Sequence, residues 1–398
     1  MRILHMITRM ILGGAQENTL LSVLGQQARP GYEVALLTGP TAGPEGNIVP
    51  LARAQGMRIE EEPLLTRPVR PLQDWGAYRS LRRRVRRMRP DVVHTHSSKA
   101  GIRGRWAAWA EGVPFVVHTI HGLPFHPYQG WLANRMYVAA ERLAARRCHA
   151  IVSVADAMTA QALAAGVGSP AQYTTVYSGM ETEPFLRRDR DMRALRARWG
   201  LGEGDFVIGK VARLFELKGH EYLFEAFARV VKRHPASRLF LIGDGIRRER
   251  YERLARAGGF GGRVTFAGLV PREEIPEAIA VMDMVAHCSL REGLARVLPQ
   301  ALLSEKPVAS FDVDGAREVV LPGRTGFLLP PRDASALESA IESVIREPEK
   351  ARAMAREGCR LCRERFDWRR MVDSLCALYE RGLASAGLQG GRASAEMS

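Results

Sequence analysis

The feature that most limits the fold of this chain is the alternation of short, mostly uncharged, β-branched runs with longer helical patterns. Strands of this composition are typical of parallel sheets buried on both faces, and the segments between them are long enough for crossover helices. The pattern therefore predicts an α/β fold with doubly wound sheets. The predicted strands are residues 3–7, 34–38, 91–96, 115–120, 150–154, 173–177, 207–212, 238–242, 264–268, 284–288, 307–311 and 325–329.

Twelve strands are too many for one open sheet, so two Rossmann-like domains are expected. A charged, proline-containing stretch and a glycine-rich turn divide them within residues 178–204. In this architecture the carboxyl edges of two sheets face a cleft, and such edges bind ligands at their switch points. The predicted boundaries are a first domain over 1–180, a second over 181–365, a last amphipathic helix over 366–383 and a disordered tail over 384–398.

Composition favours a cytoplasmic protein. No apolar run of about 18 residues occurs, so no membrane-spanning helix is expected. Arg9 interrupts the apolar run at the N-terminus, so no signal peptide is expected. Five scattered cysteines are too few for a disulfide framework, and they fit a reducing compartment.

The positive charge is concentrated in the first half of the chain. The net charge is +15, and residues 1–180 contribute +10 of it. Seven arginines lie in Arg79–Arg89, on a predicted helix with a narrow apolar face. This segment is either a peripheral contact for an anionic membrane, at the inner face of the cell membrane, or a solvated arginine face. No aromatic residues interleave the arginines, so no nucleic-acid partner is expected.

The loop after the first predicted strand contains Gly13 and Gly14, followed by a helix that is expected to begin near Glu17. No Gly-x-Gly-x-x-Gly occurs there, which argues against a dinucleotide oxidoreductase. A glycine pair at a helix entrance lets backbone N–H groups approach an anion. The other interpretation is a tight strand-to-helix turn.

Residues 94–126 hold five of the ten histidines. A zinc site needs three or four ligands, often with a supporting carboxylate, and no Asp or Glu lies between Glu111 and Glu141. We therefore expect no metal. His121 is the candidate for a ligand-binding histidine because Gly122 beside it permits close approach. The other histidines are expected to be structural.

Two stretches of the second half carry groups suited to phosphate. Arg213 and Lys218 follow a predicted strand and can converge on a diphosphate, although they are also compatible with ordinary solvated cations. Glu292 precedes a predicted helix, whose first amides would be those of Gly293, Leu294 and Ala295 and would favour phosphate. Gln300 would lie two turns further on, roughly 12 Å along the axis. The alternative is a plain helix start.

Several motifs occur in an order that resembles the retaining glycosyltransferases of family 4, over residues 1–380. The motifs are Gly13-Gly14-Ala15, His94 to Gly101, His118 to His126, Arg213 to Gly219, Gly243-Asp-Gly245 and Glu292 to Gln300. The resemblance implies the GT-B fold, with the last helix crossing back to the first domain. It also implies a nucleoside-diphosphate-sugar donor, favouring a UDP-sugar, held by the second domain. The acceptor, a glycan or lipid-linked glycan of cell-surface polysaccharide synthesis, would be held by the first.

The resemblance also implies roles for residues. His121 would orient the donor, Glu292 would contact the donor sugar, and Arg213 and Lys218 would meet the charge of the leaving diphosphate without a metal or cofactor. The donor-binding set implied by the motifs is Gly13, Gly14, Arg213, Lys218, Gly243, Gly293, Leu294, Ala295 and Gln300. One departure is Gln300, which stands where the family has a second Glu that binds ribose; an amide can still accept and donate.

Other functions remain open at this stage. A sugar-nucleotide epimerase could use the same fold, and donor turnover without an acceptor would favour it. A non-catalytic nucleotide-sugar binding protein is suggested by Gln300. Asp312-Val-Asp314 imitates a metal motif of the other glycosyltransferase fold but follows a predicted strand, and we interpret it as a loop.

Overall fold

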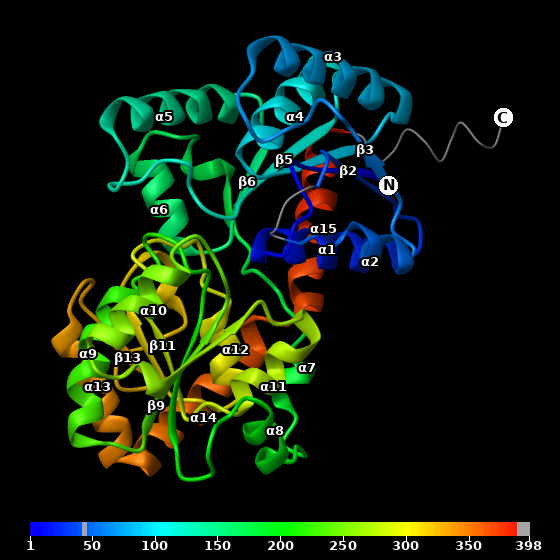
Figure 1. The fold of residues 1–398 in the computed structure, drawn as a ribbon. Coiled ribbons are helices and arrows are strands. Elements are labelled where there is room, and N and C mark those ends of the chain that lie inside the picture. Colours follow the sequence, from blue (N-terminus) through cyan, green and yellow to red (C-terminus); the bar gives the residue numbers. More distant parts are fainter. Residues whose placement is uncertain (42–45, 388–398) are drawn as a thin grey trace. The chain divides into compact units, whose positions relative to one another are not determined.

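The computed structural model describes residues 1–41 and 46–387, which form two α/β units (Figure 1). Unit 1 comprises Met1–Met180 and the chain from Trp368 onward, whereas unit 2 comprises Glu181–Asp367. All pairs of named strands are parallel in both units. The predicted α/β class with two doubly wound sheets is therefore confirmed.

Unit 1 is built on a seven-stranded sheet in the order β3-β2-β1-β4-β5-β6-β7. The strands are β1 (Arg2–Ile7), β2 (Glu33–Thr38), β3 (Ile59–Glu61), β4 (Val92–His96), β5 (Phe115–Ile120), β6 (Ala150–Ser153) and β7 (Tyr173–Thr175). The helices are α1 (Gly14–Gln27), α2 (Val49–Ala54), α3 (Pro71–Met88), α4 (Ser98–Ala110), α5 (Trp131–Ala145), α6 (Asp156–Ala164) and α15 (Trp368–Ser385). Strand β3, a short edge strand with two glutamates, was not among the predicted runs.

The core of unit 1 has two layers because successive side chains of a strand point to opposite faces of the sheet. On β1, Ile3 and Ile7 belong to one buried cluster, together with side chains of α1, α2 and α15. Leu4 and Met6 belong to a second cluster, together with side chains of α3 and α4. His5 therefore lies on the face that α1 and α15 cover.

Helix α15 returns to unit 1, as the resemblance implied. Met371, Leu375 and Tyr379 are buried in the same cluster as Ile3 and Val117 of the sheet. The helix runs through Ser385, two residues beyond the predicted end. Of the predicted tail, residues 388–398 lie outside the described residues.

Unit 2 is built on a six-stranded sheet in the order β10-β9-β8-β11-β12-β13. The strands are β8 (Phe206–Val211), β9 (Ser237–Ile242), β10 (Val264–Gly268), β11 (Met284–His287), β12 (Val308–Phe311) and β13 (Phe327–Leu329). The helices are α7 (Glu183–Leu186), α8 (Met192–Arg198), α9 (His220–Arg233), α10 (Arg248–Ala257), α11 (Ile275–Ala280), α12 (Val297–Leu303), α13 (Ala334–Arg346) and α14 (Pro348–Arg365).

Candidate active site

Each sheet has a switch point, where the strand order reverses between two neighbouring strands. In unit 1 these strands are β1 and β4, and in unit 2 they are β8 and β11. Crevices at the carboxyl ends of such strands are the usual ligand sites of open α/β sheets. Most of the residues singled out from the sequence follow these strands directly, so the two switch points are the candidate half-sites.

The centre of the unit 2 half-site is an ion pair between the two switch-point strands. Lys218 follows β8 and Glu292 follows β11, and Lys218 Nζ lies 2.5 Å from Glu292 Oε1. About a fifth of each side chain is exposed, so the pair is accessible from one side. The structure thus brings together two residues that are 74 positions apart in the sequence.

Glu292 is held as a carboxylate. Its burial on its own would raise the pKa, but the positive charge of Lys218 and the hydrogen bond from Lys218 outweigh burial and lower the pKa to about 2. Burial lowers the pKa of the neighbouring His287 to about 3, so this imidazole is neutral near pH 7. The half-site therefore presents one ammonium and one carboxylate.

The loop that carries Glu292 is fixed by Asp314, a residue whose role the sequence did not reveal. The backbone N–H of Glu292 donates to Asp314 Oδ2 at 2.6 Å. The N–H of Gly315 donates to the carbonyl of Gly293 at 3.1 Å. The only signal in the sequence was the Asp312-Val-Asp314 motif, which resembles a metal-binding motif. In the structure Asp314, its second carboxylate, holds the Glu292 loop. Asp312, its first, pairs with Arg317 at 2.5 Å.

The helix after Glu292 starts later than expected. Helix α12 begins at Val297, so the amides of Gly293, Leu294 and Ala295 lie in the preceding loop and not at a helix N-terminus. The reason is the loop's tie to Asp314, which holds it outside helical geometry. Gln300 lies within α12 and is partly buried, so the spacing of two regular helical turns from Glu292 does not apply.

Arg213 lies at the exposed end of β8, with its guanidinium carbon 5.0 Å from the centre of the Phe215 ring. Gly243 follows the neighbouring strand β9 and has a φ of 126°. A Cβ there would lie 2.3 Å from the carbonyl oxygen of Ala212. Only glycine fits this approach without strain. Gly243 thus supports the backbone that presents Arg213, and no contact to a ligand is needed to explain it.

In unit 1, the glycine pair forms the start of α1. Gly13 is the N-cap and Gly14 is the first helical residue, so the helix begins three residues before Glu17. The φ of Gly13 is 177°, an extended conformation that other residues also adopt. The pair therefore places the amides of the first turn of α1 beyond the end of β1, as an anion site would require.

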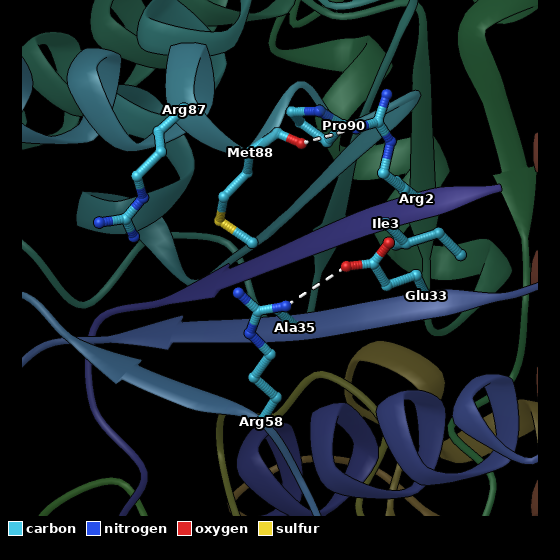
Figure 2. Close-up of a pocket in the computed structure, with 8 residues that line it drawn as sticks. All are labelled: Arg2, Ile3, Glu33, Ala35, Arg58, Arg87, Met88 and Pro90. Carbon is cyan, nitrogen blue, oxygen red and sulfur yellow. Dashed lines mark hydrogen bonds and ion pairs between the residues drawn. The ribbon is translucent and has the colours of Figure 1, made fainter.

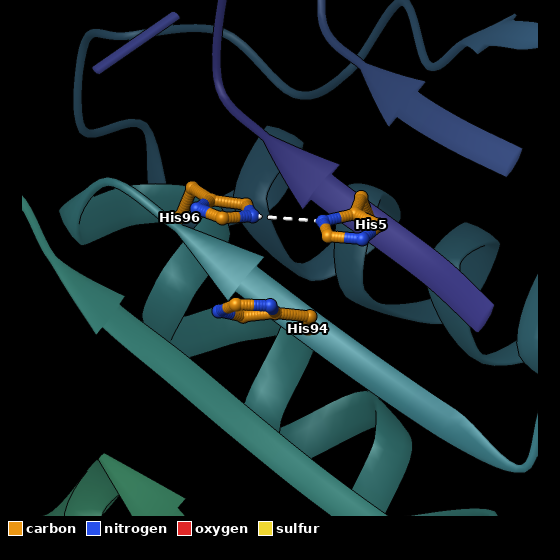
Figure 3. A group of neighbouring side chains, drawn as sticks. All are labelled: His5, His94 and His96. Carbon is orange, nitrogen blue, oxygen red and sulfur yellow. Dashed lines mark hydrogen bonds between the residues drawn. The ribbon is translucent and has the colours of Figure 1, made fainter. Parts of the chain in front are cut away.

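His121 follows β5 and contacts a group of buried histidines. Figure 3 shows three members of this group, His5, His94 and His96. His121 Nε2 lies 3.0 Å from His96 Nδ1, and His96 Nε2 lies 2.9 Å from His5 Nδ1. His5 Nε2 lies 2.8 Å from Gln26 Oε1 on α1. This chain of hydrogen bonds therefore links the carboxyl end of the sheet to the layer under α1 and α15.

The direction of this chain follows from its last member. Gln26 directs its amide nitrogen to the hydroxyl of Tyr379 at 3.4 Å, so its carbonyl oxygen faces His5 and can only accept. Burial lowers the pKa of His5 to about 4 and that of His96 well below its ordinary value, so both are neutral and carry one ring proton each. His5 then donates to Gln26, His96 to His5, and His121 to His96.

His5, His94 and His96 also form the group most suited by spacing to hold a metal among the described residues. Their hydrogen bonds do not fit that role. His5 Nδ1 and His96 Nε2 bond to each other, and His94 bonds to Tyr379 and to Thr119 Oγ1, the latter at 2.6 Å. Two nitrogens 2.9 Å apart are closer than two ligands of a tetrahedral zinc, whose bonds are about 2.0–2.1 Å.

A cavity of about 310 Å³ opens at the amino ends of β1 and β2 (Figure 2). Arg2, Arg58 and Arg87 line it, and Arg58 pairs with Glu33 at 3.3 Å. This is the edge of the sheet opposite to His121 and Gly13. None of the residues predicted for the site lines the cavity.

The arginine-rich segment forms the second half of α3. Four of its seven arginines, Arg82, Arg84, Arg86 and Arg87, form ion pairs with Glu60, Glu62 or Glu111. The charge that this helix offers to a partner is therefore much smaller than the sequence suggests. No helix of the described residues is long and apolar enough to cross a bilayer.

Comparisons with known proteins match both units of the chain to glycosyltransferases. Residues 13–184 match the family model described as Glycosyltransferase Family 4, and residues 191–360 match Glycosyl transferases group 1. EpsD of Bacillus subtilis (strain 168) is 29% identical over 326 residues, which cover 80% of this chain and 83% of EpsD. The Escherichia coli UDP-Gal:alpha-D-GlcNAc-diphosphoundecaprenol alpha-1,3-galactosyltransferase is 26% identical over 71% of this chain and 73% of its own. Among solved structures, Anabaena Alr3699/HepE in complex with UDP-glucose has a TM-score of 0.80 and 23% identity, covering 97% of this chain and all of that one.

Proposed function

Because this chain belongs to the GT-B glycosyltransferases of the family 4 type, we propose that it transfers a sugar from a nucleoside-diphosphate sugar to a hydroxyl of a glycan or lipid-linked glycan, in cell-surface polysaccharide synthesis. The transfer proceeds with retention of the anomeric configuration. The observation that carries the proposal is the Lys218–Glu292 pair at the switch point of unit 2.

Unit 2 is the donor-binding unit in this proposal. Arg213 and Lys218 follow β8 and supply two positive charges, and the loop amides of Gly293, Leu294 and Ala295 lie after β11. Gln300 on α12 hydrogen-bonds the ribose. The negative charge that develops on the leaving diphosphate is stabilised by fixed cations and N–H groups, and no metal is needed for this step.

Glu292 contacts a hydroxyl of the donor sugar. As a carboxylate with a pKa near 2, it accepts a hydrogen bond over the whole physiological range. Lys218 holds it in place before donor binds and is shared with the β-phosphate afterwards. We assign to His121 of unit 1 the role of orienting the donor sugar, which the family motifs imply.

The proposed donor is a UDP-sugar. The complex of the Anabaena protein with UDP-glucose and the UDP-Gal in the name of the Escherichia coli relative support uridine. The lipid-linked acceptor is supported by the diphosphoundecaprenol in that same name. Five free cysteines, all buried, are compatible with a reducing cytoplasm, where we place the activity.

UDP is expected to stabilise the protein against thermal unfolding, whereas GDP, ADP and CMP have smaller effects. A ligand at 100 times its dissociation constant adds about 2.7 kcal/mol. The shift is expected to be lost in Arg213→Ala and kept in Arg238→Ala, a matched control on β9 away from the switch point. Thermal unfolding with each nucleotide measures it. If no nucleotide stabilises the protein, the proposed donor class is wrong. A larger shift with GDP than with UDP would mean that the donor carries guanine and not uracil.

A peripheral contact with an anionic membrane is part of the proposal, through the exposed Arg79, Arg83 and Arg89 that form no ion pair within the described chain. We expect the protein to co-float at low salt with vesicles containing phosphatidylglycerol, but not with pure phosphatidylcholine vesicles. Binding should fall as salt is raised, because exposed charges are screened. Replacing these three arginines by glutamine should abolish flotation. An absence of flotation at low salt would remove this contact.

A further inference from the structure

A second cavity of unit 1, of about 440 Å³, opens at the carboxyl ends of β1 and β4. Thr8, which follows β1, and Ser97, which follows β4, both line it. This is the switch point of the sheet, the position where doubly wound sheets bind ligands. None of the residues to which the sequence assigned a role lines this pocket, although Ser97, Ser98 and Lys99 belong to the motif His94 to Gly101.

Four cationic side chains line the pocket: Arg9, Arg67, Lys99 and Arg103. Lys99 and Arg103 are 12% and 26% exposed, and both pair with one buried carboxylate, that of Asp74, at 2.5 and 2.7 Å. One carboxylate therefore orients two cations and compensates only one of them. Among the described residues no Asp or Glu lines the pocket, so its wall is positively charged.

The start of α4 adds backbone donors to the same wall. Ser98 and Lys99 are the first two residues of this 13-residue helix and both line the pocket. The third amide, that of Ala100, donates to Thr8 Oγ1 at 3.0 Å. No acceptor among the described residues contacts the N–H groups of Ser98 and Lys99. Uncapped amides at the positive end of a helix favour a bound anion, and here four cationic side chains converge on the same space.

Another part of the wall is apolar. Val69, Ile102, Pro124 and Tyr137 line the pocket beside the cations. A small inorganic anion would leave this surface uncovered, whereas a larger molecule with an anionic group would use both parts. The combination fits a ligand in which a phosphate is joined to a sugar or an apolar chain.

We propose that this pocket is an acceptor subsite that binds a phosphate or diphosphate group, so that the acceptor is itself a phosphorylated molecule. Arg67, Lys99, Arg103 and the first amides of α4 bind the anion, and the apolar wall contacts the group attached to it. The inference rests on the proposed transferase function, and it narrows the acceptor class from any glycan to one that carries phosphate. The shared chemistry fits both a lipid diphosphate and a sugar phosphate.

The test is calorimetric binding of inorganic pyrophosphate to the full-length protein that is already saturated with UDP, so that the unit 2 half-site is occupied. We expect pyrophosphate to bind, and to bind more weakly as ionic strength is raised. Arg67→Gln should weaken binding about 10-fold or more, the effect of one charge-assisted hydrogen bond. Arg70→Gln, an exposed arginine of the same loop that does not line the pocket, should leave it unchanged. Lys99 and Arg103 are avoided because their loss would leave buried Asp74 unpaired.

Two further binding experiments identify which kind of molecule carries the phosphate. Farnesyl diphosphate stands for a lipid diphosphate and glucose 1-phosphate for a sugar phosphate, and the true class should bind more tightly than pyrophosphate with the same dependence on Arg67. UDP binding without pyrophosphate binding, or equal binding to wild type and Arg67→Gln, would overturn the inference and leave the proposed function standing. Failure of UDP itself to bind would count against the proposed function instead.

Discussion

Replacing Lys218 by methionine is expected to lower the rate of sugar transfer about 100- to 1000-fold, the usual cost of removing one preorganised group that stabilises transition-state charge. Methionine keeps most of the aliphatic stem and removes only the ammonium, which lies 2.5 Å from Glu292 Oε1. Release of nucleoside diphosphate in the presence of acceptor measures the rate. Lys232→Met, on the exposed last turn of α9, is the matched control and should keep full activity.

The same variant should also change the titration of Glu292. Lys218 is the main group that lowers the pKa of Glu292, while burial opposes ionisation. Without the ammonium the pKa of Glu292 rises, and the acid limb of the pH–rate profile moves to higher pH. A rate loss below about 10-fold, or an unchanged acid limb, would remove Lys218 from the assigned role. The assay of the wild-type enzyme in the presence of EDTA tests whether transfer is independent of metal. NMR of the product's anomeric proton tests whether the anomeric configuration is retained.

Mild acid is expected to destabilise unit 1 by several kcal/mol between about pH 7 and pH 5. Burial lowers the pKa of His5 to about 4 and those of His94, His96 and His118 well below the ordinary value, so the folded unit keeps them neutral. In the unfolded chain they take up protons near pH 6.5. Below that pH the unfolded state binds more protons, and the free energy of unfolding falls by about 1.4 kcal/mol per pH unit for each such histidine.

This acid effect can be separated from that of carboxylates, because unfolded Asp and Glu titrate near pH 4, below the window used. Urea unfolding, monitored by hydrogen exchange in peptides of unit 1, measures the loss of stability at each pH. His5→Gln is expected to be less stable than wild type at neutral pH, because the chain from His121 to Gln26 is broken, yet to lose less stability on acidification. An equal pH slope in both proteins would mean that His5 is not held neutral.

The fold could be predicted from the sequence because its signals are local. Buried parallel strands are continuous apolar runs, and all twelve predicted runs overlap strands of the structure. The exception is β3, whose sequence Ile-Glu-Glu carries no such signal, since an edge strand needs only one buried side. Helix α15 was predicted as a helix from its amphipathic pattern, but its return to unit 1 came from the family resemblance and not from the pattern.

The candidate site was less predictable because its geometry depends on distant residues. The types and order of Arg213, Lys218 and Glu292 were apparent, but their pairing depends on β8 and β11 being neighbours at the switch point. Asp314 gave no signal of holding the Glu292 loop, and that hold displaced the start of α12. The pocket at the start of α4 was missed because its cations come from three separate segments, of which only that with Lys99 was part of a named motif.

The placement of α15 determines the order in which the two units can be completed during synthesis. Residues 181–367 of unit 2 are contiguous and can fold as soon as they leave the ribosome. Unit 1 begins first but needs Leu375 and Tyr379 to complete the cover of its sheet, and these residues are made after all of unit 2. In a nascent chain, part of this apolar sheet face therefore stays uncovered until unit 2 has been made. Of the two units, the one that is begun first is therefore the last to finish folding.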